Sequence, residues 1–181
     1  MKKILLILAD GFEEVEALGS ADFLKRCGFD VVLAGLKGAN VTGAHDIRVI
    51  ADALLSEVKV HDFAALILPG GMPGSVNLYN SDLVLETVKG FYQSGRIVAA
   101  ICAAPMVLGR AGLLCNRKFT IYPGVEDGLN GAVPTNNAVE SDGRIITGRG
   151  PGLTFKFAER VATELGAGAE AREVLRGMLL D

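Results

Sequence analysis

Short apolar runs alternate with longer amphipathic stretches along the whole chain. Consecutive apolar positions rich in Ile, Leu and Val predict buried strands, whereas apolar or small residues at helical spacing predict helices. The predicted strands are residues 3–9, 29–36, 64–71, 96–101, 118–123 and 144–152, with an edge strand at 48–52. The predicted helices are residues 13–28, 81–95 with Ser81 as N-cap, about 103–111, 154–166 and 168–180.

This alternation determines the predicted fold. Strands that are apolar on both faces and joined by helices form a parallel sheet covered on both sides. We therefore predict an α/β fold, a flavodoxin-like three-layer α/β/α sandwich with a mainly parallel sheet. The 181 residues contain no repeat and no linker, so we expect one domain spanning 1–181. Such sheets bind ligands at the carboxyl ends of strands where the strand order reverses, which directs attention to the segments after 3–9, 64–71 and 96–101.

The segment after the first strand, ADGFEEVEA, carries three glutamates at the start of a predicted helix. A helix dipole favours acidic residues in the first turn, and this alone accounts for some of them. Glu13 and Glu16 lie three residues apart and can share a face, whereas Glu14 points elsewhere. Either member of that pair is a candidate for the site.

The segment after the strand at 64–71 begins with paired glycines, in LPGGMPGS. Gly70 and Gly71 either make a tight turn or let backbone N–H groups approach a ligand oxygen. The stretch does not fit the G-x-G-x-x-G phosphate-binding pattern, and neither does TGRGPG at 147–152.

Cys102 closes the strand at 96–101 and precedes Ala-Ala-Pro. The positive end of the following helix would favour its thiolate, and a tight elbow would turn the sulfur toward the crevice. We interpret Cys27 and Cys115 as packing residues. An odd number of cysteines without a CxxC pair fits a reducing cytosol, so we expect a cytoplasmic protein.

In this order and spacing, ADGFEEVEA, LPGG, AAICAAP and TGRGPG resemble the ThiJ/PfpI superfamily, specifically its Parkinson-disease-linked deglycase branch. The resemblance runs nearly end to end and implies the same flavodoxin-like fold (class I glutamine amidotransferase-like), a reactive elbow cysteine and a homodimer. It implies that Cys102 is the nucleophile and Glu16 its partner carboxylate. It also implies that Gly70, Gly71 and Ala103 form the loop and backbone N–H groups around the reacting oxygen.

Two positions depart from the pattern of the family. Relatives with protease-like chemistry often have a histidine directly after the elbow cysteine, where this chain has Ala103. The deglycase branch often has a histidine before a later proline, where this chain has Tyr122. Tyr122 can hydrogen-bond to substrate but cannot act as a base near neutral pH, which leaves Glu16 as the main proton carrier.

The leading functional hypothesis is cofactor-independent glyoxalase or deglycase chemistry on methylglyoxal, glyoxal or their adducts, releasing lactate or glycolate. An alternative is an oxidative-stress sensor or redox-regulated chaperone that uses oxidation of Cys102. A PfpI-like cysteine hydrolase is a third reading, which the missing histidine disfavours. The expected partners are a small dicarbonyl substrate and a second copy of the chain.

Charge and composition limit other functions. Net charge is −3 and the sequence contains no basic block, so nucleic-acid binding is not expected. The two histidines lack metal-ligand spacing with the cysteines, so we expect no metal. The apolar start is too short for a signal peptide, and no run approaches the length of a membrane span. His45, Arg48 and Arg149 either line an anion-friendly rim, make dimer contacts or serve as surface charge with structural pairing.

Overall fold

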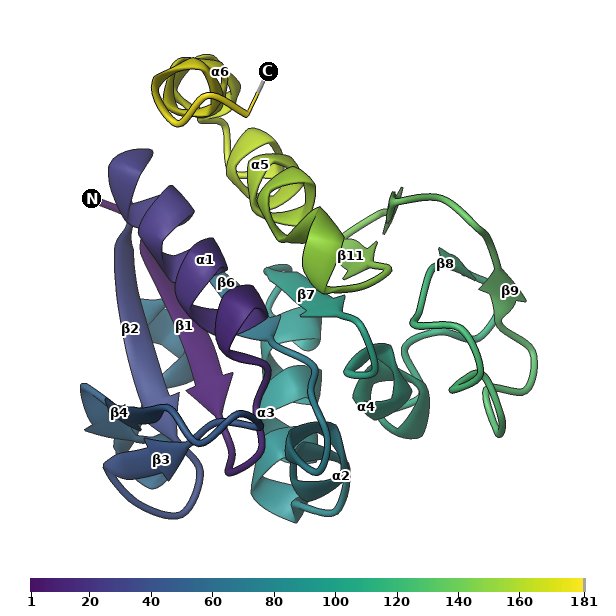
Figure 1. Cartoon of the computed structure of the whole chain (residues 1–181). Helices are drawn as coiled ribbons and strands as arrows, with labels where there is room; N and C mark the ends of the chain where they lie inside the picture. Colours follow the sequence, from purple (N-terminus) through teal and green to yellow (C-terminus); the bar gives the residue numbers. More distant parts are fainter. Residues whose placement is uncertain (181) are drawn as a thin grey trace.

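The computed structural model describes residues 1–180, and its centre is a seven-stranded sheet in the order β10-β11-β7-β6-β1-β2-β5 (Figure 1). All neighbouring strands are parallel except β10, which is antiparallel to β11. The strands are β1 Lys3–Leu8, β2 Asp30–Gly35, β5 Ala53–Leu54, β6 Ala65–Leu68, β7 Ile97–Ile101, β10 Val139–Asp142 and β11 Ile145–Gly148.

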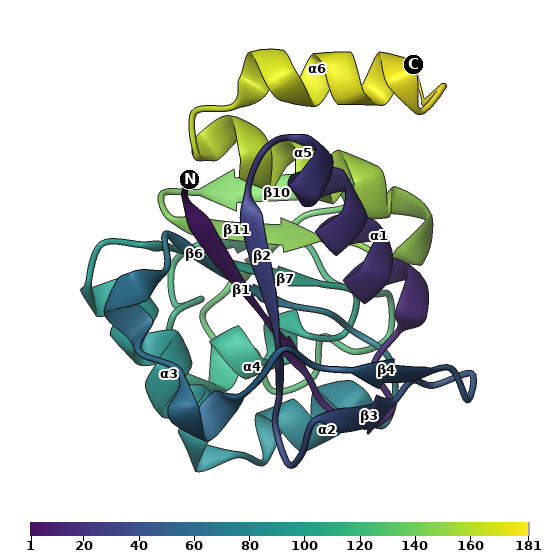
Figure 2. The same ribbon diagram turned by 90° about the vertical axis from the view of Figure 1, so that its left-hand side faces the viewer.

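Helices cover both faces of this sheet, as Figure 2 shows. One layer consists of α1 Glu14–Arg26, α5 Thr154–Glu164 and α6 Gly168–Gly177. The other consists of α2 Gly74–Tyr79, α3 Asp82–Gln93 and α4 Pro105–Arg110. The short 3₁₀ helices are η1 Leu55–Glu57, η2 Val60–Asp62 and η3 Pro151–Leu153. The flavodoxin-like three-layer prediction is confirmed.

The sheet core explains why the strands read as continuous apolar runs. In β1, residues 4–8 are all fully buried; Ile4, Leu6 and Leu8 pack toward α1 and α5, and Leu5 and Ile7 pack toward α3. Burying each of these side chains contributes about 1.5–3 kcal/mol. Alternate residues of β1 thus pack into the hydrophobic cores on opposite faces of the sheet. A strand with a polar face could not occupy this position.

Two predicted strands lie outside the main sheet. The predicted edge strand at 48–52 is β4 Arg48–Ile50, which pairs with β3 Asn40–Thr42 in a separate antiparallel hairpin. The predicted strand at 118–123 shortens to β8 Lys118–Phe119, which pairs with β9 Val133–Pro134. The chain leaves β8 because the next backbone N–H groups bond elsewhere: that of Thr120 to the Thr147 hydroxyl, and that of Tyr122 to the Cys102 carbonyl.

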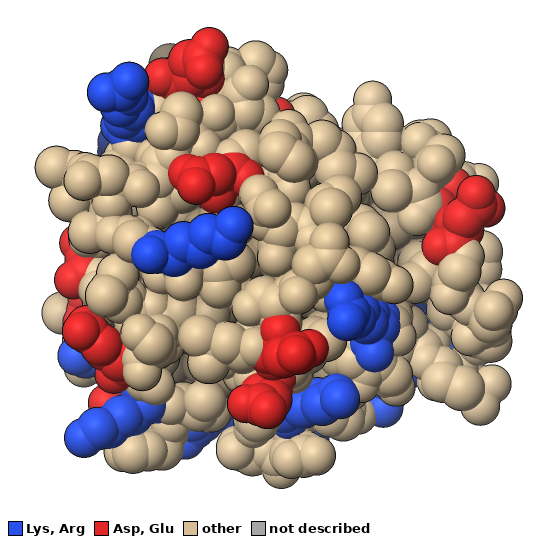
Figure 3. All heavy atoms as spheres, turned by 90° about the horizontal axis from the view of Figure 1, so that it is seen from below, with Lys and Arg blue, Asp and Glu red and all other residues tan. Residues whose placement is uncertain are grey.

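The topology places three strand ends side by side. Strands β1, β6 and β7 are adjacent in the sheet, and the chain order reverses between β1 and β6. The segments after these strands therefore meet at one edge, where the switch-point rule places ligands. Seen from below, the molecule carries Lys/Arg and Asp/Glu side chains of both signs dispersed over the surface (Figure 3). Within residues 1–180, no helix has the length and apolarity needed to cross a membrane.

Candidate active site

The elbow after β7 holds Cys102 in a left-handed backbone conformation, with φ of 62°. Two hydrogen bonds fix this geometry: the Cys102 N–H donates to the Gly148 carbonyl at 2.9 Å, and its carbonyl accepts from the Tyr122 N–H at 2.9 Å. A side chain on a left-handed residue costs about 1–2 kcal/mol. The neighbouring segments therefore hold the cysteine in a strained turn, with 9% of the residue exposed.

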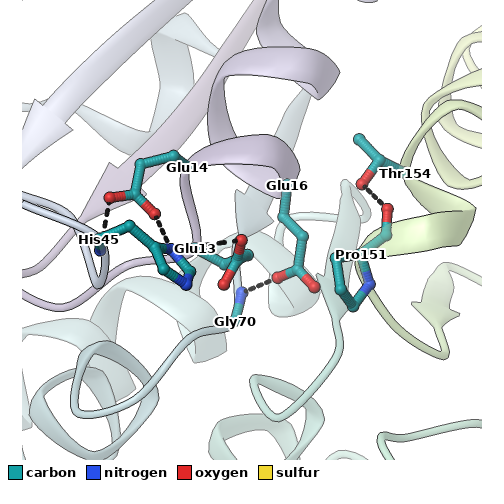
Figure 4. Close-up of polar contacts among 7 residues, drawn as sticks. All are labelled: Glu13, Glu14, Glu16, His45, Gly70, Pro151 and Thr154. Carbon is teal, nitrogen blue, oxygen red and sulfur yellow. Dashed lines mark hydrogen bonds and ion pairs between the residues drawn. The ribbon is translucent and has the colours of Figure 1, made fainter. Parts of the chain in front are cut away.

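Glu16 lies in the first turn of α1 and is fully buried beside this cysteine. Its Oε2 accepts a hydrogen bond from the Gly70 N–H at 2.7 Å, a contact that Figure 4 shows. The Cys102 thiol lies within hydrogen-bonding reach of the same carboxyl. Glu16 Oε1 has no hydrogen-bond partner in the described part of the chain. A buried carboxyl with a free oxygen is poorly solvated as an anion and can exchange a proton with a neighbour.

The paired glycines are required by this close approach. A β-carbon on Gly70 would lie 2.5 Å from the Cys102 Cβ and 2.7 Å from Glu16 Oε2. Gly71 has φ of 90°, and a β-carbon there would lie 2.3 Å from the Glu13 backbone nitrogen. The loop after β6 therefore packs against both Cys102 and Glu16 only because it has no side chains.

Burial dominates the protonation of the pair. Burial raises the pKa of Glu16 to about 7, and the Gly70 N–H and the Cys102 hydrogen bond oppose that rise while the Glu13 charge adds to it. Burial, followed by the charge of Glu16 and a hydrogen bond with it, raises the pKa of Cys102 to about 12. The sulfur therefore keeps its proton near neutral pH, while Glu16 is close to half ionised.

The expectation that the elbow favours the thiolate is thus wrong for the resting site. The backbone N–H groups of Gly71 and Ala103 act to lower the pKa of the sulfur, but burial and Glu16 outweigh them. The helix that follows has only six residues, so its dipole is small. The sequence could not reveal this, because depth of burial is a property of the folded chain.

A pocket of about 350 Å³ opens over Cys102. It is lined by Glu13, Gly71, Met72, Cys102, Ala103, Tyr122, Pro123, Val125 and Pro151. The predicted residues Gly71, Ala103 and Tyr122 thus share one cavity with the cysteine. Gly70 and Glu16 lie behind the wall, in contact with the cysteine. The Tyr122 ring is half-exposed, and its backbone also fixes the elbow.

Glu14 does not face this pocket. Its carboxylate accepts hydrogen bonds from the His45 backbone N–H at 2.7 Å and from His45 Nδ1 at 2.8 Å (Figure 4). These bonds lower the pKa of Glu14 against the opposing effect of burial, and the Glu14 hydrogen bond raises the pKa of His45. Glu14 and His45 thus tie the start of α1 to the β3–β4 hairpin. The prediction that Glu14 points away from the Glu13–Glu16 face is confirmed.

Glu13, Glu14 and His45 place possible ligand atoms within 4.8 Å of one another. A divalent cation at that position would compete with the Glu14–His45 hydrogen bond. No comparable group occurs elsewhere among residues 1–180.

The remaining candidate residues lie outside the pocket. Arg149 donates to the Asn136 carbonyl at 3.1 Å, and Arg48 is exposed on β4. Cys27 is buried, as expected, and burial raises its pKa to about 11. Cys115 is exposed, so its interpretation as a packing residue is wrong. It lies in the loop after α4, where the following residue has a left-handed backbone and the chain turns back at the surface.

Sequence reasoning missed part of the pocket wall. Met72 and Val125 come from loops whose paths the apolar pattern does not predict. Pro151 belongs to the TGRGPG stretch, and its carbonyl accepts a hydrogen bond from the buried Thr154 hydroxyl at 2.7 Å (Figure 4). The glycine content of that stretch was the only signal available for it.

Comparisons with known proteins agree with the geometry. The family model of the DJ-1/PfpI family matches residues 2–164. Protein dj-1beta of Drosophila melanogaster is 37% identical over 99% of this chain and 97% of its own length. A protein named a deglycase in Pyrococcus abyssi is 37% identical over 86% of this chain and 94% of its own.

Solved structures show the same fold. The crystal structure of Drosophila melanogaster DJ-1beta superposes with a TM-score of 0.93 at 37% identity, covering 98% of this chain and 97% of that one. Toxoplasma gondii DJ-1, described as oxidized, gives 0.93 at 30% identity, covering 99% and 98%. The resemblance carried by the four sequence motifs is confirmed, and the chain belongs to the DJ-1/PfpI family.

Proposed function

We propose that this protein is a cofactor-independent enzyme that converts small α-oxoaldehydes such as methylglyoxal and glyoxal into lactate and glycolate. The observation that carries the proposal is the fully buried Glu16 carboxyl, with a pKa of about 7, against the Cys102 thiol beneath an open pocket. A general acid–base group is most effective when its pKa lies near the working pH. The deglycase name of the Pyrococcus abyssi relative supports activity on adducts of the same aldehydes.

The first step uses the proton that the sulfur retains. The Glu16 carboxylate accepts the thiol proton while the sulfur attacks the aldehyde carbon. It then gives that proton to the former aldehyde oxygen, so that a hemithioacetal forms and the carboxylate is regenerated. The N–H groups of Gly71 and Ala103, two residues that line the pocket with Cys102, stabilise the oxygen on which negative charge develops. Proton transfer at the moment of attack removes the need for a stable thiolate.

The second step moves hydrogen within the substrate. Glu16 removes the proton from the former aldehyde carbon and returns it to the neighbouring carbonyl carbon, through an enediol. The result is a 2-hydroxyacyl thioester on Cys102, which water hydrolyses to the hydroxyacid and the free thiol. One carbon is oxidised and its neighbour reduced, so only water is consumed.

We further propose, from the family resemblance, that the enzyme is a cytoplasmic homodimer.

The test is lactate formation from methylglyoxal. Cys102→Ser and Glu16→Gln should each abolish turnover, while Cys115→Ser, which alters an exposed thiol outside the pocket, should retain it. Absence of lactate with the unmodified protein would overturn the proposal.

Glu16→Gln also tests whether turnover depends on Glu16 as a base or on the fraction of Cys102 present as thiolate. Removing the Glu16 charge should lower the pKa of Cys102, so alkylation of this thiol should begin at lower pH in the variant. The variant should therefore hold more thiolate and yet turn over less substrate. Turnover that rises together with alkylation would show that Glu16 is not the proton carrier.

A second candidate function is oxidation sensing, either directly or as a redox-regulated chaperone acting through the dimer surface. The description of the Toxoplasma gondii relative as oxidized favours it. Two equivalents of peroxide would convert the thiol first to a sulfenic acid and then to a sulfinic acid, each peroxide being reduced to water. Protonated Glu16 and the N–H groups of Gly71 and Ala103 could bond to the sulfinate oxygens. Mass spectrometry after mild peroxide treatment should show two added oxygens on Cys102 before Cys115, and the reverse order would exclude this role.

A further inference from the structure

The pocket over Cys102 has an uneven wall. Met72, Tyr122, Val125 and two prolines give it an apolar surface, and Glu13 is the one charged residue that lines it in the described chain, residues 1–180. No basic residue lines this pocket in the same range. A ligand entering it therefore meets apolar groups and a single carboxylate.

Backbone contacts fix the position of Glu13. It is the N-cap residue of α1, and its backbone N–H donates to the Gly70 carbonyl at 2.9 Å. The glycine loop that packs against both Cys102 and Glu16 thus also anchors Glu13. Only 18% of its side chain is exposed. The carboxylate is therefore held at the pocket wall.

The neighbouring charges do not cancel the charge of Glu13. His45 Nδ1 lies 3.8 Å from Glu13 Oε1, but it bonds more closely to Glu14 at 2.8 Å, and its side chain is 67% exposed (Figure 4). Glu16, the other carboxyl next to the cysteine, has the same sign when ionised. Among residues 1–180, the one charge that lines the pocket is therefore negative, and Glu16 behind the wall adds to it when ionised.

We propose that Glu13 is a specificity-determining residue that makes the Cys102 pocket select uncharged oxoaldehydes with apolar substituents and reject anionic ones. The substrate class rests on the proposed function, whereas the charge discrimination applies to any electrophile that reaches the sulfur. At separations of about 5–8 Å and effective dielectric constants between those of a protein surface and water, one carboxylate disfavours a monoanion by about tenfold.

A pair of alkylating reagents tests the discrimination without turnover. The rates of uncharged iodoacetamide and anionic iodoacetate are measured at Cys102 and, in the same sample, at the exposed Cys115. The fraction of thiolate is common to both reagents at one thiol, and their intrinsic reactivities are common to both thiols. The rate ratio at Cys102 divided by that at Cys115 therefore reports charge and access. We expect the rate ratio of iodoacetamide to iodoacetate to be about tenfold larger at Cys102 than at Cys115, and to fall toward the Cys115 value at high salt.

Glu13→Gln should lower the Cys102 ratio toward that of Cys115, and the charge of Glu16 accounts for any remainder. The matched control is Glu86→Gln, which removes one negative charge from the exposed face of α3 and should leave the ratio unchanged. An unchanged ratio in Glu13→Gln would overturn the proposal. If that variant does not fold, the salt series on the unmodified protein decides, and a ratio that does not respond to salt would overturn it.

The substrate class is tested with 4,5-dioxopentanoate, an anionic oxoaldehyde, and its uncharged methyl ester. The unmodified protein should prefer the ester in kcat/KM by about tenfold, and Glu13→Gln should narrow that preference. Equal use of both compounds would refute the specificity but leave the proposed reaction intact. No turnover of either compound or of methylglyoxal would refute the proposed reaction, and the alkylation ratios would still test the charge discrimination.

Discussion

Replacing Glu16 by glutamine should stabilise the protein above neutral pH. The fold raises the pKa of this buried carboxyl from 4.5 to about 7, so ionising it in the native state costs roughly 3 kcal/mol more than in the unfolded chain. Glutamine is nearly isosteric, cannot ionise and can still accept the Gly70 hydrogen bond. The variant should therefore lack the penalty altogether.

The pH dependence follows from which state binds the proton. Below about pH 4.5 both the folded and the unfolded chain hold it, and no penalty exists. Between about 4.5 and 7 the unfolded chain releases the proton while the folded chain keeps it, so the stability of the unmodified protein falls with rising pH. Above about pH 7 the penalty is complete, and Glu16→Gln should be more stable by roughly 3 kcal/mol.

Urea unfolding monitored by circular dichroism at a series of pH values from about 4.5 to 8.5 measures this difference. The range ends near the ordinary pKa of a thiol, so the raised pKa of Cys102 contributes only a few tenths of a kcal/mol, at the upper end. Glu86→Gln on the surface of α3 serves as the control and should give a constant difference. A difference between Glu16→Gln and the unmodified protein that does not grow with pH would refute the buried, proton-binding carboxyl on which the proposed chemistry depends.

Three further substitutions test the surroundings of the site. Gly70→Ala places a methyl group 2.5 Å from the Cβ of Cys102. It should therefore destabilise the protein by about 1–3 kcal/mol and lower methylglyoxal turnover at least tenfold. Normal turnover would contradict this packing argument. Glu14→Gln should lower the pKa of His45 toward its ordinary value, and an unchanged midpoint in an NMR titration of the imidazole would exclude the pairing. Thr154→Val removes the hydroxyl that donates a hydrogen bond to the Pro151 carbonyl. The free energy of unfolding in urea should fall by about 1–2 kcal/mol. An unchanged free energy of unfolding would show that water replaces the bond.

The main sheet and the three segments that meet at the site could be predicted from the apolar pattern, whereas the choice of Glu16 and Cys102 within those segments came from the family resemblance. Continuous apolar runs identify doubly covered strands, and parallel strands bring their carboxyl ends together. Glu16, Gly70 and Cys102 therefore meet although 54 residues separate Glu16 from Gly70 alone. The spacing correctly indicated that Glu14 points away from the pocket, although the Glu13 carboxylate also lies near His45.

The short hairpins and the protonation states could not be predicted in the same way. In β4, the burial alternates over only three residues, too few to distinguish a sheet edge from a separate hairpin. The bond between Glu14 and His45 joins residues 31 positions apart and depends on the path of that hairpin. The pKa of Cys102 depends on how deeply α1 and the glycine loop cover the sulfur, which no local pattern encodes.

The left-handed backbone at Cys102 affects which amino acid would be favoured at this position if selection for the chemistry were lost. Glycine adopts that conformation freely, whereas any residue with a β-carbon strains the turn by about 1–2 kcal/mol. At this elbow, glycine would relieve the backbone strain, whereas cysteine is needed to supply the thiol. A descendant that no longer needed the reaction could therefore gain stability by replacing Cys102 with glycine.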